Sequence, residues 1–414
     1  MPPPIAARTS KLERAGRSPS GAAFTLAALL FVTGAGAGCH WKPDRSERGE
    51  DRAFELETLQ RYAEIAFEGY SDATEAANRL VGAVADLLAQ PSPARLAAAR
   101  LAWLNARTPY LQTETFRFYD GPIDRVEGFV NTWPIDENYV DSAASANRVG
   151  IVENSAAYPE LSGPLLLTLN EKEGETNVST GFHVVEYLLW GRDTRADGPG
   201  DRSYEDYVTL GRPDAQRRAT YLKLASELLA QHLAQVATAW APNQDNYRAR
   251  FLALPPRDAL GLVIKGMGTL SGPELSGERL TVAYETKEQG NEHSCFSDNT
   301  HNDIVYDALG VENVCLGRHR RLDGSETSGP GLCDLLARRD SAMAKRLEGE
   351  LAASVAAARA IPAPFDQAIL GSDAAPGRQG ILRAIKALQA QAATLASAAA
   401  TLGVSLSLSE VKGP

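Results

Sequence analysis

Apolar side chains recur at helical spacing through much of the chain, and this pattern predicts a mainly α-helical fold. The pattern runs from residue 51 to residue 90, is broken by Pro91 and Pro93, and resumes from Ala94 to Arg107, ahead of Pro109. These stretches predict the first three helices of a bundle. Runs of β-branched residues and Asn-Gly hairpin signals are scarce, so little strand is expected.

The second half of the chain continues the helical pattern in a form rich in alanine. Arg217 to Trp240 is predicted to be one long amphipathic helix. Residues 332–370 and 378–402 predict two or three more helices, separated by prolines and a glycine. Leucine and isoleucine keep the helical period there, so the alanines indicate close helix packing rather than disorder. The expected fold class is all-α.

The most apolar segment is NVSTGFHVVEYLLWG, residues 177–191, which predicts one buried helix. Asn177 or Ser179 is placed to cap its start, and Gly191 is placed to end it. Inside it lie His183 and Glu186, three residues apart, so both side chains project from the same side of the helix. A buried carboxylate and imidazole need partners, which can be each other, an arginine or a metal ion.

Two interpretations of this pair stay open from the residues alone. It is either a hydrogen-bonded pair in the core, or half of a metal site whose other ligands come from distant segments. The chain contains no Glu-x-x-His, His-Glu-x-x-His or His-x-x-Glu-His. It therefore lacks the usual ligand spacing of ferritin-like bundles and of the best-known zinc protease helices.

Two other regions carry candidate polar residues. Residues 110–139 are dense in aromatics, acids and turn residues, and Glu114 falls among the aromatics, where a partly buried charge needs a partner. The stretch NEHSCFSDNTHND, residues 291–303, places two histidines eight apart among acids, which makes it a second candidate ligand cluster. His319 stands in an arginine-rich stretch and is expected to be exposed.

The N-terminus has the pattern of an export signal. A basic region is followed by an apolar core at residues 22–32, then by small residues and Cys39. This resembles a bacterial lipoprotein signal, with residues 1–38 removed, Cys39 lipidated and residues 39–50 serving as a polar tether. Ordinary cleavage near the same place is the alternative. The lipid anchor would attach the protein to a bacterial membrane in the cell envelope, and without it the protein would be periplasmic.

Charge and cysteine content narrow the function further. With 42 basic and 52 acidic residues the formal net charge is −10, which argues against a nucleic-acid partner.

If Cys39 is lipidated, Cys295, Cys315 and Cys333 remain, so at most one intramolecular bridge can form among them. The spacing does not tell which pair is bridged.

Several blocks of the sequence resemble one known family. GFHVVE (181–186) looks like the G-x-H-x-x-E motif of imelysin-like proteins, which are iron-regulated envelope proteins of bacteria. TETFRFYDGPID (113–124), ENSAAYPEL (153–161), LSGPELSGER (270–279) and NEHSCFSDNTHND (291–303) resemble further blocks of that family, in the same order. The resemblance spans nearly all of the chain beyond the signal.

The resemblance implies an all-α fold of two packed four-helix-bundle-like halves, with the His183–Glu186 pair between them. We place the halves at residues 51–210 and 211–405 of one imelysin-like domain. The other metal ligands are expected among Glu114, Asp298 and His301. Cys315 and Cys333 are additions to the family pattern, which suggests a bridge between them.

Three functions are compatible with this resemblance. The first is a metal-binding protein of the bacterial cell envelope that serves iron uptake or iron homeostasis with other iron-transport proteins; iron is the expected ion, and zinc is the second choice. The second is an imelysin-type metallopeptidase, in which the metal activates water. The third is an envelope scaffold without metal. The first is preferred because the sequence shows no separate general base beside the ligands.

Overall fold

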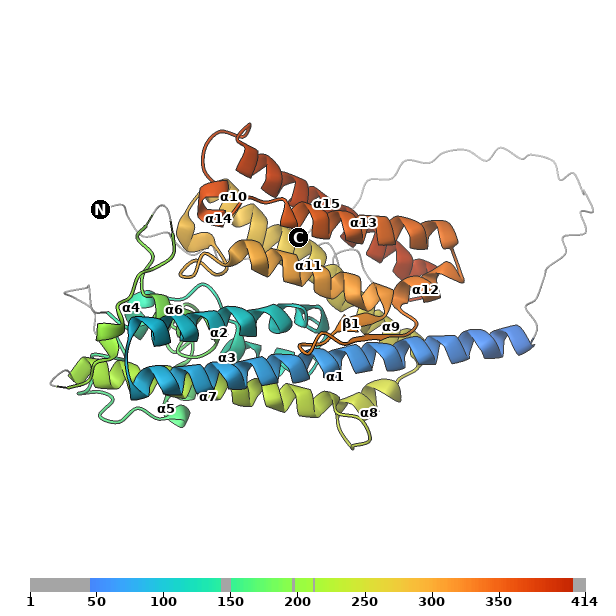
Figure 1. Cartoon of the computed structure of the whole chain (residues 1–414). Helices are drawn as coiled ribbons and strands as arrows, with labels where there is room; N and C mark the ends of the chain where they lie inside the picture. The colour runs from blue at the N-terminus through green and yellow to red at the C-terminus, as the bar shows by residue number, and fades with distance from the viewer. Residues whose placement is uncertain (1–44, 143–149, 196–197, 211–212, 405–414) are drawn as a thin grey trace, which may run out of the picture. The chain divides into compact units, whose positions relative to one another are not determined.

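The computed structural model describes residues 45–142, 150–195, 198–210 and 213–404, and these form an almost entirely helical structure (Figure 1). The predicted all-α fold is confirmed. The expected signal segment 1–38 and Cys39 lie outside the described residues. The predicted tether, residues 39–50, lies partly outside them as well, and the first helix begins within it, at Arg45.

The N-terminal half is built around one long helix, α1 (Arg45–Ala89). The sequence pattern had suggested that residues 51–90 contain two helices, but no proline interrupts them and the helix is continuous. Helices α2 (Pro93–Leu111) and α7 (Pro213–Trp240) pack along α1. Helix α2 runs through Pro109, which sits in its last turn, where the missing N–H removes only one hydrogen bond.

The short helix α6 (Phe182–Trp190) is fully buried against α2 and α7. It begins later than the sequence indicated, because Gly181 with φ 93° and not Asn177 or Ser179 occupies its N-cap position. A Cβ at Gly181 would stand 2.7 Å from the carbonyl oxygen of Val130, so only glycine allows this approach. Gly191, with φ 75°, ends the helix as predicted.

The C-terminal half consists of helices that pack mainly on one another. They are α9 (Pro256–Thr269), the π-helix η4 (Leu270–Thr281), α11 (Thr300–Leu316), α13 (Ser341–Arg359) and α15 (Pro376–Thr401). The halves meet where α11 contacts α2 and α9 contacts α1. Helix α7, which we had assigned to the second half, belongs by its packing with the N-terminal helices.

Short elements connect these helices. They are η1 (Glu114–Phe116), η2 (Ile123–Arg125), α3 (Glu127–Val130), α4 (Glu137–Val140), α5 (Gly163–Leu169), η3 (Tyr204–Tyr207), α8 (Tyr247–Leu252), α10 (Val282–Thr286), η5 (Gln289–Asn291), α12 (Leu332–Ala337) and α14 (Phe365–Ala368). In the described part of the chain, no helix is both long and apolar enough to span a bilayer.

A two-stranded hairpin is the one sheet among the described residues. Its strands β1 (Arg318–Arg320) and β2 (Glu326–Ser328) are antiparallel, with His319 opposite Thr327. The expectation that His319 is exposed was wrong, because the ring is buried and its Nε2 lies 3.0 Å from Asp72 Oδ2 on α1. Nearby, Cys315 and Cys333 form a disulfide, the pairing that the family resemblance suggested.

Candidate functional site

His183 and Glu186 form a buried pair on α6. The imidazole Nδ1 lies 3.0 Å from Glu186 Oε2, and neither side chain is accessible to solvent beyond 1%. The three-residue spacing on one helical turn produces this contact, as the sequence indicated. The pair is therefore preformed by α6 itself.

The other oxygen of Glu186 is held from a distant segment. Ser297 donates to Glu186 Oε1 from its backbone N–H at 2.9 Å and from its hydroxyl at 2.7 Å. Burial raises the pKa of Glu186 to about 8, and the hydrogen bonds from Ser297 oppose this rise. The carboxyl group is thus fixed in orientation and mostly protonated at neutral pH.

His183 keeps one nitrogen without a partner. Its Nε2 is buried and makes no hydrogen bond within the described residues. Burial, with smaller contributions from Arg107 and His293, lowers the pKa of His183 well below its ordinary value. The ring is therefore neutral at pH 7. While Glu186 is protonated, its Oε2–H donates to Nδ1 and Nε2 carries the ring proton; once Glu186 releases its proton, Nδ1–H donates to the carboxylate and Nε2 presents a lone pair.

A second histidine, His293, lies beside the first. The two ring centroids are 4.9 Å apart, and His293 Nδ1 lies 2.8 Å from Asp303 Oδ2. Burial lowers the pKa of His293 to about 4, while Arg107 and His293 hold the pKa of Asp303 well below its usual range despite burial. Nδ1 lies between the donor Arg107 Nη2, at 3.3 Å, and the acceptor-only Asp303 carboxylate, at 2.8 Å. The shorter contact favours the proton on Nδ1, and in that tautomer Nε2 is the acceptor nitrogen.

Asp303 also accepts hydrogen bonds from three other side chains. Arg107 Nη2 and the Ser294 hydroxyl each lie 2.6 Å from Oδ2, and Asn299 Nδ2 lies 2.9 Å from Oδ1. A buried carboxylate satisfied in this way keeps its charge. These hydrogen bonds fix the orientation of the carboxylate, and the carboxylate in turn orients the His293 ring.

Arg107 joins this cluster from α2. Its guanidinium is fully buried, donates to Asn131 Oδ1 at 2.5 Å, and lies 4.9 Å from the centroid of Phe182. Because Phe182 directly precedes His183, the arginine also packs against the first turn of α6. The site is thus assembled from α2, α6, the 291–299 segment and α11.

A pocket of about 340 Å³ extends outward from His293. Its wall is formed by Asn131, Thr132, Trp133 and Pro134 on one side, and it includes charged residues from several elements: Arg117, Glu127, Glu171, Glu274, Glu278 and Arg279. The pocket is large enough for a small ligand. It ends at one of the two imidazoles.

The π-helix η4 supplies three of these charged residues. Glu278 and Arg279 follow Glu274 by four and five positions. A π-helix, with i to i+5 hydrogen bonds, places both of them on nearly the same face as Glu274. An α-helix would separate Glu274 and Arg279 by more than a third of a turn. π-Helical segments are rare in proteins, and those that occur are often found at functional sites. The position of η4 beside the pocket agrees with this.

The three further ligands proposed from the sequence form no cluster of three ligand side chains with the imidazoles in the described ranges. Glu114 is buried, and its Oε2 accepts from Arg117 Nη1 and Arg279 Nη2, each at 2.6 Å, so two arginines balance its charge, while its Oε1 has no hydrogen-bond partner among the described residues. Asp298 follows Ser297. Burial raises its pKa, and the neighbouring carboxylates of Asp366 and Asp193 raise it further.

His301 is half-buried on α11, and its Nδ1 has no partner in the described part of the chain. Among the described residues, no three His, Cys, Asp or Glu side chains converge as a ready-made metal site. Of the two histidines in the 291–303 block, the structure brings His293 and not His301 to His183.

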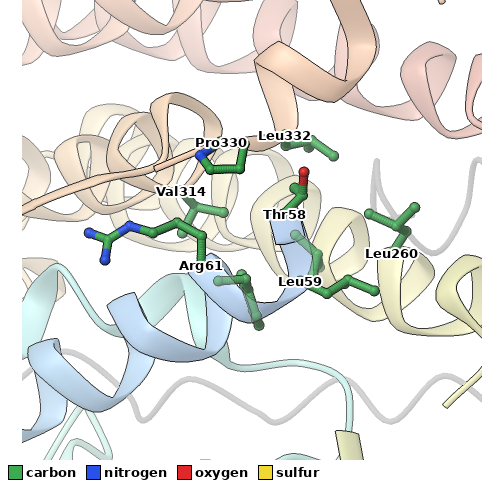
Figure 2. Close-up of a pocket in the computed structure, with 9 residues that line it drawn as sticks. Thr58, Leu59, Arg61, Leu260, Val314, Pro330 and Leu332 are labelled. Atoms are coloured by element: carbon green, nitrogen blue, oxygen red, sulfur yellow. The ribbon is translucent and has the colours of Figure 1, made fainter. Parts of the chain in front are cut away.

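A smaller pocket between α1, α9 and the end of α11 is not a candidate ligand site. Figure 2 shows it lined by Thr58, Leu59, Arg61, Leu260, Val314, Pro330 and Leu332. Its volume of about 10 Å³ is at the limit for one water molecule. A larger pocket of about 400 Å³ is lined by Ala76, Arg79, Ala102, Asn105, Thr108, Tyr306 and Leu322 and contains no histidine or carboxylate. We place the functional site at the histidine pair, because the buried imidazoles and carboxyl groups meet there.

The sequence model of the family described as Imelysin matches residues 66–395, which is most of the chain and includes every residue of the site. The chain belongs to the imelysin family.

One curated relative of this imelysin is "Iron-regulated protein A" of Synechococcus elongatus, 27% identical over 350 residues, with 82% of this chain and 84% of the relative covered. A crystal structure of a putative iron-regulated protein A precursor from Parabacteroides distasonis matches with a TM-score of 0.67 at 18% identity, covering 88% of this chain and 97% of that one.

The crystal structure of an imelysin-like protein from Psychrobacter arcticum matches with a TM-score of 0.62 at 14% identity, covering 86% of this chain and 97% of that one. These two structures establish the imelysin fold of the chain.

Proposed function

We propose that this imelysin binds a metal ion, with iron as the expected ion, through the Nε2 atoms of His183 and His293. The observation that carries the proposal is the pair of buried imidazoles, each of which is bonded at Nδ1 to a carboxyl group: His183 to Glu186 and His293 to Asp303. A carboxylate on one ring nitrogen is the usual way of orienting the other nitrogen toward a metal.

The protonation states fit this role. A metal ligand must offer a neutral imidazole, and burial keeps both rings neutral at pH 7. The Nε2 of His183 is buried without a hydrogen-bond partner, which costs free energy. A bound ion would remove that cost. Imidazole donors suit Fe(II) and Zn(II), whereas Fe(III) would favour a shell richer in oxygen.

Two imidazoles leave several coordination positions to other donors. Because no third His, Cys, Asp or Glu converges with them in the described ranges, water in the adjoining pocket would complete the shell. Glu186, the carboxyl group that a metallopeptidase would use as its base, already accepts from Ser297 and contacts His183. This arrangement supports binding rather than hydrolysis.

The role in iron supply rests on the family and on the signal pattern. A relative named for its regulation by iron favours a function in iron uptake or homeostasis. The basic and apolar N-terminal pattern ending at Cys39 favours an exported protein of the bacterial envelope, anchored by lipid to the membrane. Its partners would then be the metal ion and iron-transport proteins of the envelope.

Calorimetric titration with Fe(II), kept anaerobic, and with Zn(II) tests the proposal. We expect one stoichiometric site in the wild type, its loss in His183→Ala and in His293→Ala, and no change in His232→Ala. His232 is the control because it is a half-buried histidine that also has an unpartnered nitrogen, and its ring stacks on Phe129 rather than on either histidine of the pair. A wild type that binds neither ion would overturn the proposal.

A further inference from the structure

The pocket in front of His293 has an excess of negative charge, and this excess is the basis of a second inference. Its wall carries four glutamates and two arginines. The arginines do not neutralise all four, because both are already committed to a carboxylate outside the wall. Arg117 and Arg279 each donate to Glu114 at 2.6 Å.

The remaining charge of the two arginines is balanced inside the pocket. Arg279 donates to Glu274 at 2.8 Å, and Arg117 lies 3.1 Å from Glu127. Glu171 and Glu278 stay outside this network. Glu171 is exposed and accepts a hydrogen bond from the Thr132 hydroxyl at 3.2 Å, while Glu278 is exposed and makes no ion pair with another described residue.

A buried amide in the pocket lining points to a ligand that carries oxygen. Asn131 is 3% exposed and lines the pocket. Its Oδ1 accepts from Arg107, which identifies the other amide atom as the N–H₂ group, and this Nδ2 has no partner in the described part of the chain. An oxygen atom inside the pocket, such as that of a water molecule, would satisfy it.

We propose that this pocket admits the ion as a hydrated divalent cation and rejects anionic chelates of the same metal. The inference rests on the proposed function and adds the chemical form of the cargo. Size does not decide between the two forms, since the pocket volume of about 340 Å³ is many times the roughly 10–15 Å³ that one water molecule needs on the same measure, and would hold either. Charge does: Glu171 and Glu278 attract a cation and repel an anionic chelate such as the citrate complex of the same divalent ion.

The test compares association rates of a hydrated ion with binding of a chelate. Co(II), an air-stable divalent probe, is mixed with the protein in a stopped-flow instrument at low and high salt. We expect Glu171→Gln/Glu278→Gln to slow association about fivefold at low salt and to flatten its dependence on ionic strength. Glu285→Gln, which removes an exposed carboxylate from α10 outside the pocket, is the control and should change neither.

Equilibrium titration with Co(II) in excess citrate, where the ion is held as an anionic complex, completes the experiment. We expect no saturable binding of the citrate complex by the wild type. Unchanged Co(II) rates in the double variant, or citrate-complex binding as tight as that of the free ion, would overturn this inference and leave the proposed function standing. A wild type that binds no hydrated ion would overturn both.

Discussion

Arg107 and Asp303 form an ion pair of 2.6 Å in which neither side chain is exposed to solvent. One residue comes from α2 in the N-terminal half and the other from α11 in the C-terminal half. A buried pair of this kind is strongly destabilised when one member is removed, since the other charge is left uncompensated. The contact therefore couples the stability of the fold to the integrity of the site.

The first prediction concerns this pair. Arg107→Met and Asp303→Leu should each lower the free energy of unfolding by about 3–5 kcal/mol, because each leaves a buried charge alone. The double variant should lose less than the sum of the two. Urea denaturation of the wild type and three variants gives the coupling energy. Additive losses would show that the pair does not interact in solution.

The second prediction concerns pH and Glu186. In the fold its pKa is about 8, and its ordinary value is 4.5. Between these values the folded protein keeps a proton that the unfolded chain has released, so this group makes the protein less stable as pH rises from 4.5 to 8. Glu186→Gln does not titrate. Its stability relative to the wild type should therefore improve from pH 5.5 to pH 8, measured by denaturation with a chelator present.

A shift of the opposite sign would contradict this prediction, because it would mean that Glu186 is ionised in the fold. The comparison between variant and wild type is needed because both histidines titrate as well. They are neutral in the fold, so they weaken the protein as pH falls below about 6.5. The substitution also changes the contact of His183, so the comparison is decided between pH 7 and pH 8, where both rings are mostly neutral in the folded and the unfolded chain.

The third prediction concerns close approach of the two halves. A Cβ at Gly310 on α11 would stand 2.4 Å from the carbonyl oxygen of Gln112, which follows α2. Gly310→Ala should therefore cost about 1–3 kcal/mol of stability through overpacking. Gly349→Ala is the control, since a Cβ there meets nothing within 4 Å, and it should stabilise α13 by up to about 1 kcal/mol. Thermal unfolding should separate the two, and a neutral Gly310→Ala would argue against this contact.

The fourth prediction concerns the disulfide. Cys315 and Cys333 are 18 residues apart, and closing a loop of that length stabilises a protein by about 3 kcal/mol in the chain-entropy description. Replacing both with serine should lower the free energy of unfolding by about that amount while leaving the histidine pair in place. Denaturation of the oxidised wild type against the double variant measures it; equal stabilities would mean that the bridge does not form.

The sequence was informative where function depends on neighbours along the chain. The three-residue spacing of His183 and Glu186 sets their contact on any helix, and Gly191 marks the helix end. The start of α6 was misplaced because Gly181 is selected by the approach of Val130, a tertiary contact with no local signal.

Partners from distant segments could not be predicted in the same way. His293 and His301 share one block, and only packing decides which of them reaches His183. Glu114 was a reasonable ligand among aromatics, but its partner Arg279 is 165 positions away. His319 looked exposed among arginines and is buried because Asp72 on α1 bonds its ring. In each case the deciding contact joins remote parts of the chain.

The separation of these contacts along the chain has a consequence for folding kinetics. Arg107 and Asp303 are 196 positions apart, and Ser297 and Glu186 are 111 apart. Contacts of such high order carry the largest loop-closure entropy, so they form after the local helices and after each half has collapsed. A refolding intermediate with native-like helix content would still lack the fixed imidazole pair. The state of that pair would then report the last step on the path to the native protein.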